Sequence, residues 1–358
     1  MEYIFKDVLD IKNGKNQREV ECPDGQYPIY GSGGVMGYAS DYICEADTVI
    51  IGRKGSINNP IYAEEPFWNV DTAFGLCAKK DILLPKYLFY FCIKFDFERL
   101  NRTVTIPSLT KSDLLKIKIQ VPSLDVQQEV IDKLTKIESI LNFRKQELKL
   151  LDELVRGRFV ELFGDPVSNS YGLPEATLPE LGVFGRGVSK HRPRNDPKLL
   201  GGDYPLIQTG DIANAGLYIT SYNSTYSEFG LKQSKMWEKG TLCITIAANI
   251  AKTAILEFDA CFPDSVVGFT ANERTNNIFI HYWFFFFQAI LESQAPESAQ
   301  KNINLKILSE LKVIVPEKEG QNEFANFVHR IDKSKLIVQK ELDETQLLFD
   351  SLMQEYFG

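Results

Sequence analysis

Basic and amide side chains gather on a short glycine-flanked loop early in this 358-residue chain. The loop IGRKGSINN, Ile51–Asn59, follows a predicted strand. Its polar members are Arg53, Lys54, Ser56, Asn58 and Asn59. Arg and Lys side chains neutralise phosphates or pair with guanine edges, and Asn pairs with adenine edges. The stretch therefore indicates either a nucleic-acid contact or a solvated turn.

Two further loops have the same basic character. KNGKNQR, Lys12–Arg18, is the weaker one and contributes Lys12 and Lys15. FGRGVSKHRPRNDPK, Phe184–Lys198, is the most basic loop of the chain, with candidate phosphate contacts at Lys190, Arg192 and Arg194. From Arg186 to Lys198 it holds five basic residues and one acid, a local net charge of +4. Phosphate contact and a plain solvated loop both remain open for it.

Smaller polar stretches complete the candidate set. GSGGVMG, Gly31–Gly37, indicates a turn or a close backbone approach to a ligand, and IQTGDI and AANIAKTAI follow predicted strands. NRTVTIPSLT and AQKNINLK each precede a last strand, which would direct them to the same face as the loops above. The candidate residues of these stretches are Ser32, Arg102, Thr209, Asn249, Lys252, Lys301 and Asn302.

No stretch carries the residues of a known catalytic motif. There is no G-x-x-x-x-G-K-[ST] loop, no H-E-x-x-H and no [DN]-P-P-[FYW] methyltransferase tetrapeptide. PDSVV, Pro263–Val267, lacks the E-x-K that would continue a nuclease motif. The histidines His191, His281 and His329 show no ligand spacing, and His281 lies among aromatic residues typical of a core. We therefore predict no catalytic residue and no metal site in this chain.

The elements that would position these loops occur twice. Aligning Val121-Pro122 with Val315-Pro316 gives an offset of 194 that places Gln127 on Gln321 without a gap. The register runs on to Phe163-Gly164 and Phe357-Gly358. Upstream, Asp71 and Gly75 match Asp264 and Gly268 at an offset of 193, and Tyr27-Pro28 matches Tyr204-Pro205 at 177. The chain is thus one unit written twice, with insertions in the variable first part of each unit.

Each unit ends in a long charged helix. Val121–Gly164 has no proline or glycine between Ser123 and Arg156, and such a helix is roughly 60 Å long. Both helices carry a heptad-like apolar seam, which we expect to pack helix on helix rather than each helix folding back on its own domain. The seam residues are Leu134, Ile137, Leu141, Leu148 and Leu151, then Val328, Ile331, Val338, Leu342 and Phe349. Arg144 and Lys335 interrupt the two seams at different places.

The globular parts read as mixed, β-rich structure, because short β-branched and aromatic runs alternate with glycine-rich turns. We predict an α+β chain of four segments: residues 1–122, a central helix over 123–164, residues 165–316, and a C-terminal helix over 317–358. The six cysteines form no CxxC pair, which favours reduced thiols in the cytoplasm. No apolar run approaches the length of a membrane span. The net charge of −8 taken alone argues against nucleic-acid binding. The local distribution of charge matters more, and the basic loop described above is compatible with such binding.

At this point the sequence resembles a known family, the specificity subunits of type I restriction–modification systems. The resemblance covers essentially the whole chain. It is carried by YPIYGSGG, the IGRKGSI…NVDTAFGL block, the IPSLTKSDLLKIKIQVPSLDVQQ junction, LVRGRFVELFGDP, YPLIQTGDI, PDSVVGF and the two repeated helices. Each motif alone is weak, but their order and duplication are specific.

The resemblance implies two target recognition domains, each reading one half of a split DNA site, held apart by two antiparallel helices. It implies a DNA-binding subunit without catalytic activity that takes part in phage defence. Its partners would be double-stranded DNA, two methyltransferase subunits and two motor-nuclease subunits. S-adenosylmethionine, Mg and ATP are expected only in those partner subunits, with no cofactor in this chain.

Three alternatives remain open on the sequence. The chain could serve a related system that modifies DNA without restriction, and neighbouring genes would separate that case. It could be a coiled-coil adaptor that binds only proteins, which DNA-binding assays would test. A self-sufficient enzyme would reveal itself by turnover with the pure chain.

Overall fold

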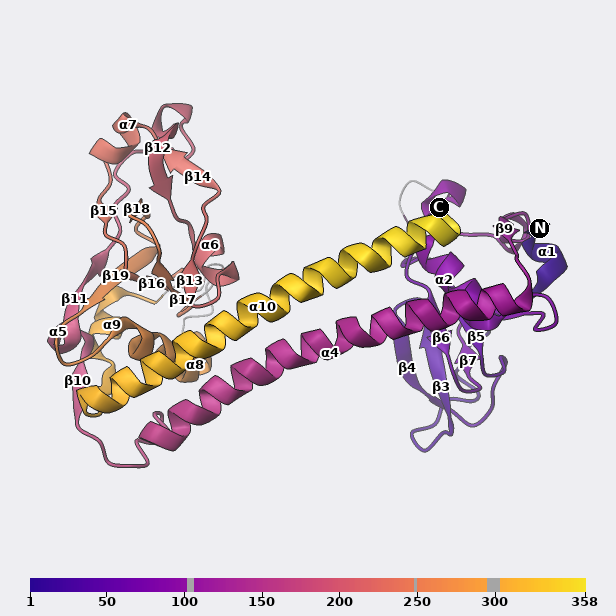
Figure 1. Cartoon of the computed structure of the whole chain (residues 1–358), viewed down its shortest axis with the longest axis horizontal. Coiled ribbons are helices and arrows are strands. Elements are labelled where there is room, and N and C mark those ends of the chain that lie inside the picture. Colours follow the sequence, from indigo (N-terminus) through magenta and orange to yellow (C-terminus); the bar gives the residue numbers. More distant parts are fainter. Residues whose placement is uncertain (102–105, 248–249, 295–302) are drawn as a thin grey trace. The chain divides into compact units, whose positions relative to one another are not determined.

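The chain folds into two compact units that share two long helices. The computed structural model describes residues 1–101, 106–247, 250–294 and 303–358. Unit 1 comprises Met1–Glu147 and Val338–Gly358, and unit 2 comprises Leu148–Ile337. Helices α4 (Leu124–Phe163) and α10 (Lys318–Phe357) are 40 residues each, and each belongs in part to unit 1 and in part to unit 2 (Figure 1). Both units mix helices and sheets, so the predicted α+β class is confirmed.

The globular part of unit 1 contains nine strands and three short α-helices in its described residues, with a 3₁₀ turn η1 (Phe97–Leu100). The strands are β1 (Glu2–Ile4), β2 (Leu9–Asn13), β3 (Tyr27–Gly31), β4 (Gly34–Ala39), β5 (Thr48–Gly52), β6 (Ile61–Ala63), β7 (Trp68–Asn69), β8 (Ala73–Ala78) and β9 (Lys118–Gln120). The helices are α1 (Phe5–Val8), α2 (Pro85–Lys94) and α3 (Lys111–Leu114).

Unit 2 has a larger set of elements, with a 3₁₀ turn η2 (Pro197–Leu199). Its strands are β10 (Glu175–Thr177), β11 (Gly182–Arg186), β12 (Leu200–Leu206), β13 (Tyr218–Ile219), β14 (Ser224–Tyr226), β15 (Met236–Trp237), β16 (Leu242–Thr245), β17 (Thr253–Leu256), β18 (Ala260–Cys261), β19 (Val266–Ala271) and β20 (Lys312–Ile314). Its helices are α5 (Leu178–Leu181), α6 (Thr209–Asn214), α7 (Glu228–Lys232), α8 (Asn277–Gln294) and α9 (Leu305–Glu310).

The sheets of the two units have equivalent topologies. Unit 1 contains the pair β1-β9, the sheet β2-β8-β5-β6 and the sheet β4-β3-β7. Unit 2 contains the pair β10-β20, the sheet β11-β19-β16-β17-β13 and the sheet β14-β12-β18-β15. A parallel contact recurs as well, since β3 lies parallel to β7 and β12 lies parallel to β18. Unit 2 adds two edge strands, β13, which lies parallel to β17, and β15, which lies antiparallel to β18. The repeat found in the sequence is therefore a repeat of the whole fold.

Residues matched by the repeat play matched structural roles. Thr110 caps α3 and Asn304 caps α9, each through a side-chain oxygen that accepts a backbone N–H of the first turn. Gly75 and Gly268 both lie where another chain segment comes close. A Cβ on Gly75 would lie 2.5 Å from Cys44 Sγ, and one on Gly268 would lie 2.7 Å from the Trp237 ring. Only glycine fits either position without rearrangement.

The change of offset along the repeat has a structural cause. In unit 1 only Ser32 and Gly33 connect β3 to β4, so these strands form a tight hairpin. In unit 2 residues 207–223 connect the equivalent strands β12 and β14, and they form α6 and β13 on the way. The insertion accounts for most of the shift from 177 to 193 between the matched residues on either side.

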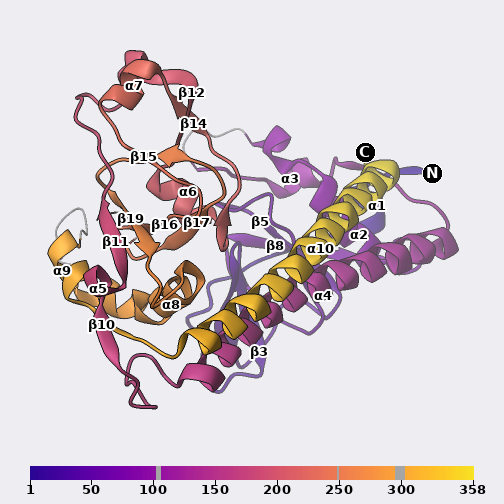
Figure 2. The same cartoon turned by 60° about the vertical axis from the view of Figure 1, so that its left-hand side comes forward.

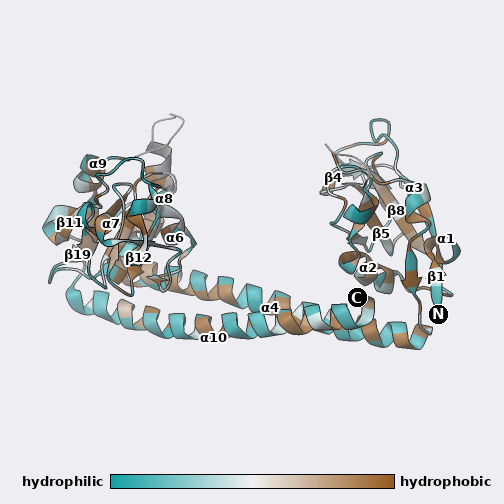
Figure 3. Cartoon of the chain, turned by 90° about the horizontal axis from the view of Figure 1, so that it is seen from above, coloured by the Kyte–Doolittle hydropathy of each residue, from teal (hydrophilic) through white to brown (hydrophobic). Residues whose placement is uncertain are grey.

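Each unit has its own main core. Helix α2 lies in the unit 1 core with buried Tyr87, Leu88 and Phe91, and α8 lies in the unit 2 core with buried Phe279, Trp283 and Phe284. Hydropathy colouring shows brown, apolar residues within the globular parts, whereas α4 and α10 alternate brown and teal along their length (Figure 3).

Within each unit the long helices pack on one another and on the globular part. In unit 1, Leu134 and Leu141 of α4 share a core with Phe349 of α10, and Ile137 and Leu342 pack at its edge. In unit 2, Val328 is buried and Ile331 packs against the core that contains the α4 residues Val155 and Phe159. The first half of α4 thus meets the last half of α10, which is an antiparallel pairing (Figures 1 and 2).

Both helix contacts considered from the sequence therefore occur together. Val338 is buried, whereas Leu148 and Leu151 are half-buried. The two charged interruptions of the seam are neutralised across the helix pair. Arg144 pairs with Glu341 at 2.7 Å, and Lys335 pairs with Asp152 at 2.6 Å.

A buried glutamine fixes each long helix to the globular part of its own unit. The Gln127 amide donates to the carbonyls of Ile82 and Pro122, both at 2.9 Å, and its oxygen accepts from Leu84 N–H at 2.8 Å. Gln321, its partner in the repeat, donates to the carbonyls of Arg274 and Pro316 and accepts from the Thr275 hydroxyl, all at 2.9 Å. Both glutamines are 0% exposed. Among the residues described, no helix is long and apolar enough to span a membrane.

Candidate nucleic-acid interface

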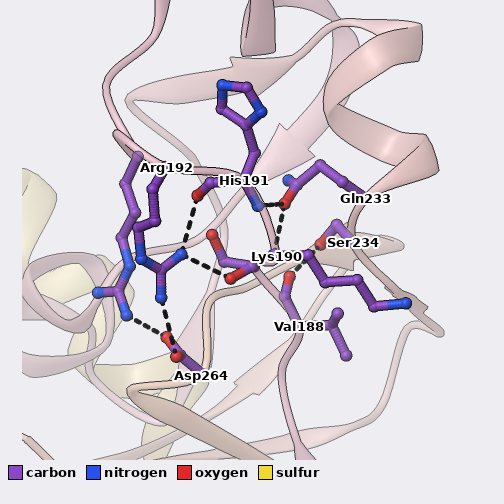
Figure 4. Close-up of polar contacts among 9 residues, drawn as sticks. Val188, Lys190, His191, Arg192, Gln233, Ser234 and Asp264 are labelled. Atoms are coloured by element: carbon purple, nitrogen blue, oxygen red, sulfur yellow. Dashed lines mark hydrogen bonds and ion pairs between the residues drawn. The ribbon is translucent and has the colours of Figure 1, made fainter.

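The basic loop of unit 2 is the connection from β11 to β12, and the end of α7 holds its backbone in place. The N–H groups of Lys190 and His191 donate to Gln233 Oε1 at 2.7 and 3.0 Å (Figure 4). The Ser234 hydroxyl donates to Val188 O at 2.8 Å. The loop is therefore an ordered platform for its charged side chains.

An aspartate on the neighbouring turn orients the two arginines of this loop. Arg192 donates to the carbonyls of Ser189 and His191 at 2.7 and 2.8 Å, and its second amino group lies 3.5 Å from Asp264 Oδ2. Arg194 donates to the other oxygen of Asp264. The Arg192 and Arg194 side chains remain 54% and 48% exposed, so both guanidinium groups are held and still face solvent.

A second acid orders the far end of the loop. Asp196 Oδ2 lies 2.9 Å from His191 Nε2, and Asp196 Oδ1 accepts the Lys198 N–H at 3.0 Å. The Lys198 N–H and then the His191 ring hold the pKa of Asp196 below its ordinary value. The His191 ring in turn packs edge-on against Phe229, with ring centres 5.5 Å apart.

Arg194, together with Arg186 from the end of β11, borders a polar cleft of about 280 Å³. It contains cationic donors, the Asp264 carboxylate as acceptor and short polar side chains, which are the groups that read phosphates and base edges. Its lining residues are Arg186, Arg194, Ile246, Ala247, Asp264, Ser265, Ile303 and Asn304.

In unit 1 the other predicted loops lie around the turn that precedes β8 and contains Asp71. We call this place, and the Asp264 turn before β19 in unit 2, the corner of the unit. Lys12 and Lys15 are both exposed. Lys12 lies in strand β2 and Lys15 in the β2–β3 connection, which corresponds to the β11–β12 loop of unit 2. Lys15 N–H donates to Asn69 O at 2.9 Å, and Trp68 Nε1 donates to Lys15 O at 3.1 Å. The two basic loops predicted separately from the sequence are therefore the same loop of the repeat.

The Arg53 loop lies at this corner too. Arg53 N–H donates to Thr72 O at 2.7 Å, and its guanidinium donates to Asp71 O at 3.4 Å. The backbones of Lys54 and Ser108 form an isolated antiparallel β-bridge, which places the described end of the Asn101–Thr110 stretch beside Lys54. Asp71 and Asp264, matched by the repeat, thus occupy the turn at which the basic groups of each unit converge.

The remaining candidates take different places. Ser56 and Asn59 are exposed beside Arg53, and Ser32 lies next to Gly52 and Gly55. The Asn58 side chain joins two partners of its own unit, since it donates to Asp96 Oδ1 at 3.1 Å and accepts from Phe97 N–H at 2.7 Å.

Two candidates of unit 2 lie away from the arginine cleft. Lys252 borders a separate cavity of about 190 Å³ with Arg156 and His281, and Thr209 begins helix α6, whose later residues line that same cavity. Four candidates, Arg102, Asn249, Lys301 and Asn302, lie outside the described residues.

Sequence reasoning did not identify Asp264 and Gln233 as members of this interface. Asp264 was visible as the repeat partner of Asp71, and its acidity near a basic loop could have suggested an ion pair. Gln233 carried no signal, because its role depends on α7 lying against a loop 40 residues earlier. Within the described residues, no group of three or more His, Cys, Asp or Glu side chains could hold a metal ion.

Comparisons with known proteins agree with this geometry. The family model described as type I restriction modification DNA specificity domain matches residues 1–152 and again residues 180–346. The putative type I restriction enzyme MjaX specificity subunit of Methanocaldococcus jannaschii is 20% identical over 288 residues, which is 76% of this chain and 67% of that protein. A putative type I specificity subunit of Mycoplasma pneumoniae is 25% identical over 148 residues, 39% of this chain and 48% of its own length.

Solved structures share the fold over the whole length. The type I restriction-modification S subunit from M. genitalium superposes with a TM-score of 0.65 at 18% identity, covering 100% of this chain and 96% of that one. A chain from a structure that describes assembly and conformational transition of the type I R-M system gives 0.56 at 13% identity, covering 100% and 97%. The double match of the family model and the doubled fold lead to one conclusion: this chain belongs to the type I restriction modification DNA specificity family.

Proposed function

We propose that each unit reads one half of a bipartite DNA site, so that the chain as a whole selects the sequence on which a modification complex acts. The observation that carries this proposal is the matched corner of the two units, where basic side chains converge on the turn of Asp71 or Asp264. Two readers built on one fold but with different side chains suit a site with two unlike halves.

The long helices support a fixed gap between the half-sites. At about 1.5 Å per residue, a 40-residue helix is about 60 Å long, nearly two turns of duplex DNA. The buried glutamines tie each helix to the reader of its own unit, so a change in helix length would be transmitted to the spacing of the readers. Deletion of whole heptads should therefore change the gap and leave the half-site sequences unchanged.

The helices also offer surfaces for the methyltransferase subunits. Apolar side chains stand exposed at positions that the repeat matches, Phe143 with Ile337 and Leu154 with Leu348. Exposed apolar side chains are better anchors for a protein interface than the charged residues around them. Matched anchors fit two identical partners, one for each repeat.

Catalysis, on this proposal, belongs to the partner chains. S-adenosylmethionine, Mg and ATP would be bound there, and the methylated adenine would be flipped out of the duplex by the methyltransferase subunit. Neither a modification-only system nor a restriction system is favoured by any contact described above. A protein-only adaptor is disfavoured, because it would have no use for two ordered arginine-bearing corners.

Gel-shift measurement of the chain co-expressed with its methyltransferase partner tests the proposal. Arg53→Ala with Lys54→Ala should weaken binding to all duplexes, because it removes side chains that neutralise phosphates. Each lost phosphate contact should also reduce the slope of log affinity against log salt concentration by about one. Lys94→Ala, which removes an exposed lysine from α2 of the same unit, is the matched control. Unchanged affinity in the double variant would count against the corner as the DNA-binding surface.

A further inference from the structure

The β3–β4 hairpin of unit 1 ends in an unusually thin, glycine-rich tip. Its turn consists of Ser32 and Gly33 alone, and a Cβ on Gly33 or Gly34 would meet no atom within 4 Å. Gly34 has φ +125°, a backbone conformation that favours glycine. The tip is therefore little more than a projecting backbone loop.

Two apolar side chains follow directly behind this tip and face solvent. Val35 is 53% exposed and Met36 is 62% exposed. The strand register shifts here, since Ile29 pairs with Gly37 and Tyr30 with Val35, which leaves Met36 as the extra residue of a bulge. Bulges redirect a side chain from the sheet. Here the Met36 side chain lies across Gly31 directly behind the tip, since its Sδ would be 2.6 Å from a Cβ on that glycine.

The charged groups around the tip indicate what it contacts. A Cβ on Gly52 would lie 3.0 Å from Ser32 Cβ, and one on Gly55 would lie 3.6 Å from Ser32 Oγ. The hairpin tip thus lies against the loop that carries Arg53 and Lys54, both exposed. An apolar tip flanked by cations complements a duplex groove, in which phosphates border the stacked bases.

Unit 2 has no counterpart of this tip. The equivalent connection, residues 207–223, is described throughout and contains α6 and β13 instead of a two-residue turn. The two readers, although built on one fold, therefore present different tools to DNA.

We propose that the Ser32–Met36 tip enters a groove of the half-site read by unit 1, where Val35 and Met36 wedge against a base step and partly unstack it. Unit 2 leaves its half-site stacked, so the distortion is confined to one side of the bipartite sequence. Side chains such as Met, Leu and Ile act in this way in other proteins that bend DNA. The inference rests on the proposed function, because it requires unit 1 to bind a half-site.

The test uses the full chain in complex with its methyltransferase partner. The probe is a duplex that carries the motif methylated in cells with the intact system, with 2-aminopurine placed at each step of both half-sites in turn. Flipping by the methyltransferase subunits also unstacks the target adenines, so those positions and the steps next to them are left out. At the remaining steps unstacking raises 2-aminopurine fluorescence, and we expect a rise of about twofold or more at one step of one half-site only. Val35→Ser with Met36→Ser should abolish this rise while the complex still binds the duplex.

Val183→Ser, which changes an exposed valine on β11 of unit 2, is the matched control and should leave the rise intact. Binding without a rise at any step would overturn the wedge but leave the proposed function standing. Failure of the unaltered complex to bind the duplex would overturn the proposed function and the wedge with it. Loss of methyltransferase assembly in the double variant would show that the tip contacts protein, which also overturns the proposal.

Discussion

Replacing the buried glutamine of either long helix should destabilise its unit by several kcal/mol. Gln127→Leu keeps the side chain near its original size but removes three hydrogen bonds, from Leu84 N–H and to the Ile82 and Pro122 carbonyls. A buried polar group left without a partner costs about 1–3 kcal/mol. Taking the lower end for each of the three groups gives about 3 kcal/mol.

The chain contains its own control for this experiment. Gln128 lies next along the same helix, is exposed, and makes only a bond to Asp132 at 2.7 Å, one turn away. Gln128→Leu should cost less than about 0.5 kcal/mol, because exposed pairs one turn apart contribute little. In a unit of this size about 3 kcal/mol corresponds to a loss of about 6–12 °C in melting temperature.

Thermal unfolding followed by calorimetry and circular dichroism would measure the difference. Gln321→Leu should lower the melting of unit 2 by a similar amount, since Gln321 makes the matching three bonds. If Gln127→Leu and Gln128→Leu have the same melting temperature, the buried glutamine does not hold the helix on the globular part. A change in helix length would then not be transmitted to the readers through it.

Three further changes have defined outcomes. Asp264→Asn should raise affinity for non-specific DNA several-fold and steepen its salt dependence, because both arginines become free for phosphates; Asp203→Asn, which removes an equal charge in the same unit, should do neither in a salt titration. Burial and then the Lys335 charge lower the pKa of His281 to about 4. The folded state therefore favours the neutral ring, and protonating it destabilises unit 2. The contribution of this group to the free energy of unfolding of unit 2 should be fully present above about pH 6.5 and fall by up to about 3 kcal/mol as the pH drops toward 4. Denaturant titrations over this pH range would measure the fall, which should be smaller in His281→Gln. Phe143→Lys or Ile337→Lys should each weaken binding of one methyltransferase copy in pull-down stoichiometry without changing the melting temperature.

The repeat made most of the fold predictable. A gap-free register identified both long helices, and periodicity gave seam residues such as Leu134 and Val328 that proved to be buried. The prediction that the seams pack helix on helix rather than on their own domains was only half right, because one apolar stripe makes both contacts. Phe349, for example, belongs to a core that contains residues of both α4 and the globular part of unit 1.

The candidate interface was predictable by residue type but not by arrangement. Net charge along a loop indicated Arg192 and Arg194, because charge is a property of composition. Their ion pairs with Asp264 depend on β11 and β19 being neighbours, a contact between residues more than 60 positions apart. The equivalence of the Lys15 loop and the Arg192 loop was likewise hidden, since their sequences differ and only strand order relates them.

Sequencing of methylated bases in cells that carry the intact system tests the central claim most directly. Two readers on one chain predict N6-methyladenine within a bipartite motif, two unlike half-sites separated by a fixed number of unspecified bases. Removing one heptad from both α4 and α10 should change that number and keep both half-sites. A short continuous or palindromic motif would contradict the account of two separate readers.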